Sequence, residues 1–207
     1  MEPKTQKSRA TRERLRREAA QLFSVKGYFL TTVDDVMNRV ALTKGGFYAH
    51  FSSKEELGRA VIDYATELWA ARVIEHVMKW RDPRGQLREL LEGYRLYAVD
   101  RTFAGGCFFV NLAIEMDDQH DEFRGLIEQR FDQFRMLVVS IVETGKGTGH
   151  FRADTPSAGL AVAIVAYLTG TMMLAKTSKS FELFREGNPV MTTLIASFET
   201  DAPIADS

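Results

Sequence analysis

The segment Thr43–Phe51 carries side chains that suit the binding of a polyanion. Lys44 supplies a positive charge, and Tyr48 and His50 supply hydrogen-bond donors. Phosphate oxygens of a nucleic acid accept such bonds, and they also accept bonds from backbone amides at helix starts. The segment therefore predicts an element that binds phosphates and enters a groove.

On a helical wheel this segment has two different faces. Phe47 and Phe51 are four residues apart, so they share a face that is expected to pack against neighbouring helices. The opposite face is nearly bare and consists of Gly45, Gly46 and Ala49. A helix with such a face can bring its backbone close to base edges. We expect sequence discrimination to depend on Lys44, on contact between Ala49 and a thymine methyl, and on duplex shape.

Each of these side chains also has an ordinary structural interpretation. His50 alone could cap a helix or lie in a core, Tyr48 alone could be half-buried packing, and Lys44 alone is a surface lysine. Their occurrence together, between two helix-capping patterns, favours DNA binding.

Helix signals surround this segment and are expected to position it. A first helix is predicted from Ser8 or Thr11 to Lys26, followed by a glycine stop. The next three helices are predicted to begin at the N-caps Thr32, Thr43 and Ser53. Acidic partners for two capping boxes follow at Asp35 and Glu56. Amides at these helix starts, together with Lys54, would bind phosphates.

Helical spacing continues through the remaining residues, and no stretch alternates with the period of a strand. The further predicted helices are a continuation of the fourth helix to Trp80, then Leu87–Val99, Cys107–Glu115, about 121–141, Pro156–Lys176 and Pro189–Thr200. Gly145–Gly149 is predicted to be a flexible loop, and its spacing excludes a Walker phosphate loop. The predicted fold class is all-α with about nine helices. An N-terminal three-helix helix-turn-helix domain would precede a C-terminal helical domain.

Charge is divided unevenly along the 207 residues. Residues 1–57 contain 11 Lys and Arg against 7 Asp and Glu, whereas residues 58–207 contain 16 against 21. This asymmetry is typical of a DNA-binding end joined to an acidic body, although a solvated first helix would also produce it.

Cysteine content and hydropathy predict the compartment. Cys107 is the single cysteine, and no apolar signal region follows the basic N-terminal residues, so we expect a reducing cytoplasm. The uncharged stretch 158–175 is rich in Ala, Gly and Thr. We expect it to be a buried or subunit-interface helix and not a membrane span.

Residues 9–62 resemble the DNA-binding domain of the TetR family of bacterial transcriptional regulators. The resemblance lies in Phe23–Tyr28, Thr31–Val33, Thr43–Gly45, Phe47-Tyr48 with His50-Phe51, and Ser53–Leu57. It covers about a quarter of the chain, and the rest is similar in helix pattern only. It implies a helix-turn-helix DNA-binding domain in residues 1–52, with the motif at about 32–51. Residues 53–207 would form the effector-binding and dimerisation domain.

By position, the resemblance implies two sets of DNA contacts. Phosphate contacts would come from Thr32, Thr43, Tyr48, His50 and Lys54, and groove contacts from Lys44, Gly45 and Gly46. Two residues depart from the family pattern. Ala41 occupies a turn position that is often Gly, so the turn must avoid or tolerate a positive φ. Ala49 replaces a second aromatic residue or Arg, which removes one contact.

The resemblance also implies how DNA binding is regulated. It implies a homodimer, formed through the last two helices, that binds a pseudo-palindromic double-stranded DNA operator. A small-molecule effector would release this complex. We expect a cytoplasmic bacterial repressor that is nucleoid-associated when bound and has no membrane partner. Activation stays an alternative, because polarity depends on operator position.

Candidates for the effector pocket are aromatic and polar residues of the C-terminal part. They are Trp69, Phe103, Cys107, Phe108, Asn111, Glu115, Phe134 and Tyr167. Most could equally be core residues, although buried amide and carboxyl groups would need polar partners. Cys107 fits either a redox sensor or an inert buried thiol. The acidic run 115–122 fits either a metal site or a solvated helix start, and we predict no metal and no cofactor.

An enzyme and a protein adaptor are the alternative classes. The sequence contains no nucleotide-binding loop, no metal motif and no nucleophile–base pair in a recognised spacing. Cys107 with His120 is the one conceivable pair, and nothing in the sequence brings them together. An adaptor would leave the Thr43–Phe51 pattern and the charge asymmetry unexplained. We therefore expect a regulator without catalytic activity.

Overall fold

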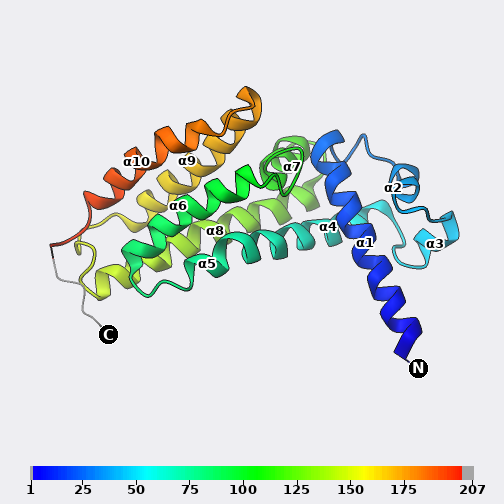
Figure 1. Cartoon of the computed structure of the whole chain (residues 1–207), viewed down its shortest axis with the longest axis horizontal. Helices are drawn as coiled ribbons and strands as arrows, with labels where there is room; N and C mark the ends of the chain where they lie inside the picture. The colour runs from blue at the N-terminus through cyan, green and yellow to red at the C-terminus, as the bar shows by residue number, and fades with distance from the viewer. Residues whose placement is uncertain (1, 202–207) are drawn as a thin grey trace. The chain divides into compact units, whose positions relative to one another are not determined.

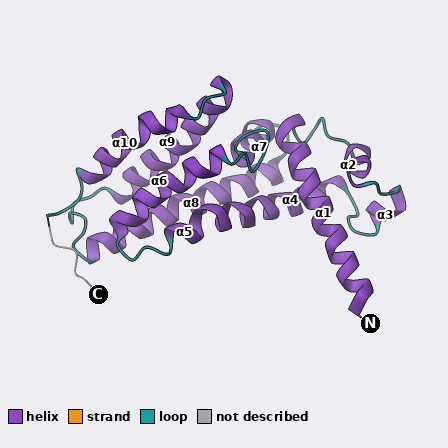
Figure 2. Ribbon diagram, in the orientation of Figure 1, coloured by secondary structure: helices purple, strands orange, loops and turns teal. Residues whose placement is uncertain are grey.

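The computed structural model describes residues 2–201, and over that range the protein is all-α (Figures 1 and 2). An isolated β-bridge between Phe151 and Glu199 is the one strand-like pairing in the described residues. If α4, η1 and α5 are counted as one continuous helix, the described chain has nine helices. The predicted fold class is confirmed. The chain forms two compact units, one running to Leu68 and including Phe103–Ile127, the other formed by Trp69–Thr102 and the residues from Glu128 onward.

The first unit is built on α1. Its helices are α1 (Glu2–Lys26), α2 (Val33–Val40), α3 (Lys44–Tyr48), α4 (Lys54–Trp69), α7 (Phe108–Met116) and the start of α8 (Asp121–Gly147). The apolar stripe of α1 packs against α2 and α7. The buried side chains at the centre of this unit include Leu15, Ala19, Phe23, Val36, Val40, Phe47, Phe51, Leu57 and Val61.

The second unit packs around α6. Its elements are the π-helical turn η1 (Ala70–Ile74), α5 (Glu75–Val77), α6 (Pro83–Val99), the remainder of α8, α9 (Ser157–Ser178) and α10 (Glu182–Ala196). α6 contacts η1, α5, α9 and α10, and α9 and α10 lie side by side (Figure 1). The buried side chains of this unit include Val73, Leu87, Leu90, Tyr94, Phe134, Val138, Ile164, Leu168, Phe184 and Ile195.

The predicted flexible loop at Gly145–Gly149 is wrong for its first three residues, because α8 continues through Gly147 and a turn follows it. Gly145 is buried against Phe151, where an added Cβ would lie 2.2 Å from the ring. Its carbonyl accepts the amides of His150 and Phe151 at 2.8 and 3.1 Å. Close packing therefore explains the glycine at this position, and flexibility does not.

The predicted start of the last helix at Pro189 is also wrong. α10 begins at Glu182 and contains Pro189 in its interior. The preceding Asn188 accepts a hydrogen bond from the Tyr167 hydroxyl at 2.7 Å and donates one to the Leu91 carbonyl at 3.3 Å. These contacts and the burial of α10 side chains offset the backbone hydrogen bond that is lost because proline has no amide hydrogen.

Two other prolines lie at helix starts. Pro83 is the first residue of α6, which therefore begins earlier than Leu87, and Asp82 caps it by accepting the Arg84 amide at 3.0 Å. Pro156 is the N-cap of α9 and not its first residue. In both cases the fixed φ of proline favours a helix start.

The compact units do not divide the chain at the predicted boundary after residue 52. α4 contacts α1 through the ion pair of Glu67 with Arg16 at 2.6 Å, and it also contacts the start of α8. Gly58 faces Phe123 so closely that an added Cβ would lie 2.5 Å from the ring. Arg59 and Glu122 form an ion pair at 2.6 Å. The first unit therefore extends well beyond the three-helix motif.

α9 is the one helix in the described part of the chain that is long and apolar enough to cross a membrane. Length and composition alone are weak evidence, because core helices of soluble proteins have the same properties. The side chains of α9 that face α6 and α10 are buried, and they include Leu160, Ile164, Leu168 and Met172.

Candidate nucleic-acid interface

α2 begins with the predicted capping box. The Thr32 hydroxyl oxygen accepts the Asp35 amide at 3.0 Å, and the Asp35 carboxylate accepts the Thr32 amide at 2.9 Å. The Thr32 amide is the largest cause that lowers the pKa of Asp35 to about 2. Thr32 is exposed, but Asp35 already engages its amide and hydroxyl. A phosphate at this helix start would therefore compete with Asp35.

The turn between α2 and α3 tolerates a positive φ at Ala41. This residue adopts φ 52° and ψ 47°, the left-handed region that costs a residue with a Cβ about 1–2 kcal/mol. The Leu42 amide donates to the Met37 carbonyl at 3.1 Å, and the Ala41 amide donates to Asn38 at 3.4 Å. These bonds end α2 and set the direction of α3.

The inner face of α3 is anchored as the spacing predicts. Phe47 and Phe51 are fully buried, and their ring centroids lie 6.1 Å apart. Thr43 has an extended backbone, and its hydroxyl oxygen accepts the Gly46 amide at 3.2 Å. The predicted N-cap is confirmed.

The outer face of α3 carries little side-chain volume. Lys44, Gly45 and Ala49 are exposed, and the Tyr48 side chain is 52% exposed. Nothing lies within 4 Å of the place where a Cβ on Gly45 would stand. Gly46 is half-buried, and a Cβ there would touch Leu42 at 3.4 Å. The open surface is therefore centred on Gly45, between the exposed side chains of Lys44 and Tyr48.

The side chain of one predicted phosphate ligand, Lys54, is engaged within the protein, whereas the contact described for His50 is made by its backbone. The Lys54 ammonium lies 4.3 Å from the centroid of the Tyr28 ring and donates to the Phe29 carbonyl at 3.3 Å. Desolvation by burial lowers the pKa of Lys54. His50 is half-buried, and its backbone carbonyl accepts a hydrogen bond from Arg12. Phosphate contacts by Lys54 and His50 stay predictions.

Arg12 of α1 is a positioning residue that the sequence did not reveal. Its guanidinium lies 4.0 Å from the centroid of the Phe51 ring and forms an ion pair with Glu56 at 3.4 Å. Glu56 also accepts the Ser52 amide at 2.7 Å, one residue before the predicted N-cap. Arg12 thus joins α1 to the end of α3. Its partners are 38 and 44 residues away, so no local pattern indicates it.

The eight effector candidates do not form one cluster. Phe103, Cys107, Phe108, Asn111 and Glu115 belong to the first unit, whereas Trp69, Phe134 and Tyr167 belong to the second. Asn111 donates to the carbonyls of Ser24 and Gly105 at 3.3 and 2.8 Å. Glu115 accepts the amides of Tyr28 and Phe29. The two polar candidates therefore bind backbone groups at the end of α1.

The aromatic candidates pack in pairs. The Phe103 and Phe108 rings lie 5.4 Å apart, and the Trp69 and Phe134 rings lie 4.8 Å apart in an edge-to-face arrangement. Cys107 is buried and forms no disulfide. No group of three or more His, Cys, Asp or Glu residues within the described range could hold a metal ion.

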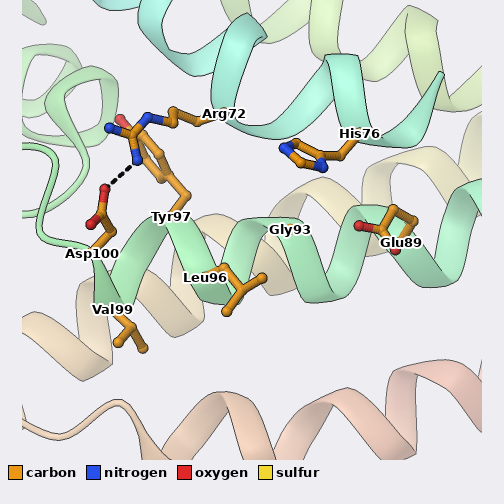
Figure 3. Close-up of a pocket in the computed structure, with 8 residues that line it drawn as sticks. All are labelled: Arg72, His76, Glu89, Gly93, Leu96, Tyr97, Val99 and Asp100. Carbon is orange, nitrogen blue, oxygen red and sulfur yellow. Dashed lines mark hydrogen bonds and ion pairs between the residues drawn. The ribbon is translucent and has the colours of Figure 1, made fainter. Parts of the chain in front are cut away.

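A groove of about 400 Å³ lies between η1, α5 and α6 in the second unit (Figure 3). It is lined by Arg72, His76, Glu89, Gly93, Leu96, Tyr97, Val99 and Asp100, none of which is among the eight candidates. Arg72 and Asp100 form an ion pair across it at 2.6 Å. One wall includes the π-helical turn η1, a feature frequent at functional sites.

Short capped helices joined by a tight turn, with an open outer face on the second helix, are the pattern of a helix-turn-helix DNA-binding protein. A family described as "Bacterial regulatory proteins, tetR family" matches residues 15–61, and one described as "Tetracyclin repressor-like, C-terminal domain" matches residues 83–187. The chain belongs to the TetR family. It is a DNA-binding transcriptional regulator of that type.

Three relatives illustrate the similarity. A TetR transcriptional regulator from Chloroflexus aurantiacus J-10-FL has a solved structure with 32% identity and a TM-score of 0.89, covering 94% of this chain and 98% of its own. The transcriptional repressor DhaR of Mycobacterium sp. (strain GP1) is 26% identical over 83% of this chain and 85% of its own length. A cysteine-substituted form of the TetR regulator CifR, solved with a 26 bp operator, shares the fold at 19% identity and a TM-score of 0.80, covering 87% and 94%.

Proposed function

We propose that this regulator is a repressor that binds a pseudo-palindromic operator as a homodimer and leaves it when a small molecule binds. The observation that carries the DNA part is the outer face of α3, where Gly45 is open and Lys44 and Tyr48 are exposed beside it. α3 has five residues, so one copy covers few base pairs. Two copies related by a two-fold axis would double the contact.

Selection of bound duplexes from random DNA tests this proposal. The expected product is an inverted repeat with half-sites separated by one helical turn or a multiple of it. Affinity should fall steeply as salt rises, because phosphate contacts release counterions. Recovery of no enriched sequence, or of a single half-site only, would contradict binding as a dimer.

The proposed dimer face consists of α9 and α10. Apolar side chains are exposed along both helices, namely Val162, Met173, Leu174, Val190 and Leu194. Small residues lie between them, including Ala166 and Gly170, and nothing lies within 4 Å of an added Cβ on Gly170. Such a face can approach a second helix closely and would bury apolar area on association.

A charge placed on this face tests the dimer. Leu194→Glu should sediment as a 23.4 kDa monomer, whereas the wild-type chain should sediment at twice that mass. Met136→Glu is the matched control, because Met136 is also an exposed apolar residue but lies on α8. Equal sedimentation of Leu194→Glu and the wild type would exclude α10 from the interface.

Release by a ligand requires that the ligand bind the arrangement that does not fit DNA more tightly than the one that does. The groove between η1, α5 and α6 is one open site for it, with charged groups on both walls and apolar Leu96 and Val99 at its edge. The eight candidates from sequence stay proposals beside it. A thermal-shift screen of small molecules, followed by operator release by the hits, tests the response. Hits that stabilise the protein without weakening DNA binding would contradict it.

A further inference from the structure

The carboxylate of Glu115 binds two consecutive amides at the connection between α1 and α2. Its two oxygens accept the Tyr28 amide at 2.8 Å and the Phe29 amide at 2.7 Å. Such charge-assisted hydrogen bonds are the strong ones in proteins. Glu115 lies on α7, 86 residues further along the chain than Phe29.

Gly27 leaves the space that this carboxylate occupies. It has φ +86°, a conformation that side chains rarely adopt, and an added Cβ would lie 2.8 Å from a Glu115 oxygen. The glycine therefore allows the positive φ of the turn after α1 and leaves room for the carboxylate.

The segment before α7 binds the end of α1 as well. The Gly105 amide donates to the Ser24 hydroxyl at 3.3 Å, and an added Cβ on Gly105 would lie 1.5 Å from the Ser24 carbonyl oxygen. The Ala104 amide donates to the Gln21 side chain at 3.3 Å. Residues 104–115 thus hold the last turn of α1 and the residues that lead into α2.

We infer that Glu115 is a positioning residue for DNA binding, which fixes the connection before α2 to α7 and thereby holds α2 and α3 in place within the first unit. α7 follows α6 and precedes α8, and both of these helices contribute to the second unit. The core of α2 and α3 is built from Val36, Phe47 and Phe51, whereas the hydrogen bonds described for Glu115 reach Tyr28 and Phe29. Loss of the carboxylate should therefore change the position of α2 and α3 and leave their own fold intact. This inference rests on the proposed dimer, in which the two helix-turn-helix domains must bind two half-sites at the same time.

The test compares two duplexes, the palindrome selected by the wild-type protein and the same duplex with one half-site scrambled. Glu115→Ala should bind the full palindrome about tenfold more weakly while its affinity for the half-site duplex changes less than about twofold. Glu115→Gln keeps one acceptor oxygen and should lie between Ala and the wild type. Glu122→Gln is the control, because it removes a carboxylate that pairs with the Arg59 side chain and accepts no backbone amide in the described contacts. Hydrogen exchange at the Tyr28 and Phe29 amides should accelerate in Glu115→Ala and not in Glu122→Gln.

Each result decides one point. Equal losses on both duplexes would assign Glu115 to the local fold and overturn the positioning role, as would no loss on either. Unchanged exchange at the two amides would also overturn it. A wild-type protein that binds full and half-site duplexes equally would instead contradict the proposed dimeric function.

Discussion

The outer face of α3, which we propose meets base edges, is built from residues that are adjacent in the sequence. The groove of the second unit is built from segments that are far apart. Thr43–Tyr48 are consecutive residues of one capped helix, and the period of the helix alone assigns them to faces. The groove needs two segments, Arg72–His76 and Glu89–Asp100, whose side chains meet only after η1, α5 and α6 have packed (Figure 3). A recognition helix is therefore predictable from spacing, whereas a pocket depends on tertiary packing.

The largest expected effect comes from a substitution in the core beneath α3, because it should remove the support of the outer face. Phe47 is fully buried, so Phe47→Ala should lower the free energy of unfolding by about 3–5 kcal/mol and abolish DNA binding. Phe47→Leu keeps most of the apolar volume and should lose much less. Urea unfolding and operator binding measure both. A Phe47→Ala protein that binds the operator normally would show that α3 does not need its anchor.

Removal of the Lys44 side chain separates base recognition from phosphate binding. Lys44→Ala should relax specificity at one base pair, with a loss of about 1–3 kcal/mol for the preferred base. Tyr48→Phe is the control, because it removes a phosphate hydrogen bond and should weaken all sequences alike. Binding to a panel of single-base operator variants distinguishes the two. Uniform weakening by Lys44→Ala would remove it from base recognition.

The turn at Ala41 offers a smaller effect of opposite sign. Because Ala41 has φ 52°, Ala41→Gly should raise the free energy of unfolding by about 1 kcal/mol. Ala10→Gly, at an exposed position inside α1, should lower it by about the same amount. Thermal unfolding of the two variants gives the signs. A destabilised Ala41→Gly would mean that the turn is not strained.

The smallest expected effect concerns acid. The pKa of Asp35 falls from 3.8 to about 2 on folding, chiefly through the Thr32 amide, so its ionised form favours the folded state. This contribution is complete above the unfolded pKa and is lost as pH falls towards 2. The stability difference between the wild type and Asp35→Asn should therefore shrink below about pH 4. A difference that does not depend on pH would contradict the capping role.

Local patterns predicted the helix starts at Thr32 and Thr43, because capping joins residues only three apart. The same patterns failed at Pro189, where contacts of Asn188 with Leu91 and Tyr167 keep the helix continuous. Sequence spacing could not find such contacts.

Glu115 shows most clearly what sequence spacing cannot predict. From sequence, Glu115 and Asn111 are candidates for an effector pocket, where buried polar groups need partners, and both side chains do have polar partners. Glu115 binds the backbone amides of Tyr28 and Phe29, and Asn111 binds the carbonyl of Ser24, all 86 or more residues away, besides the nearby Gly105 carbonyl. Periodicity places a residue on a face but does not name what that face meets.

The most direct test of the reading face compares two glycine-to-alanine substitutions in the intact protein. Gly45 and Gly125 both lie in helices with no atom within 4 Å of an added Cβ, so both variants should fold and gain slightly in helix stability. Only Gly45 lies on the face that we propose meets base edges. Gly45→Ala should weaken binding to the selected operator at least about tenfold, while Gly125→Ala binds as the wild type does. Equal affinities for Gly45→Ala and the wild type would contradict close approach of the α3 backbone to DNA.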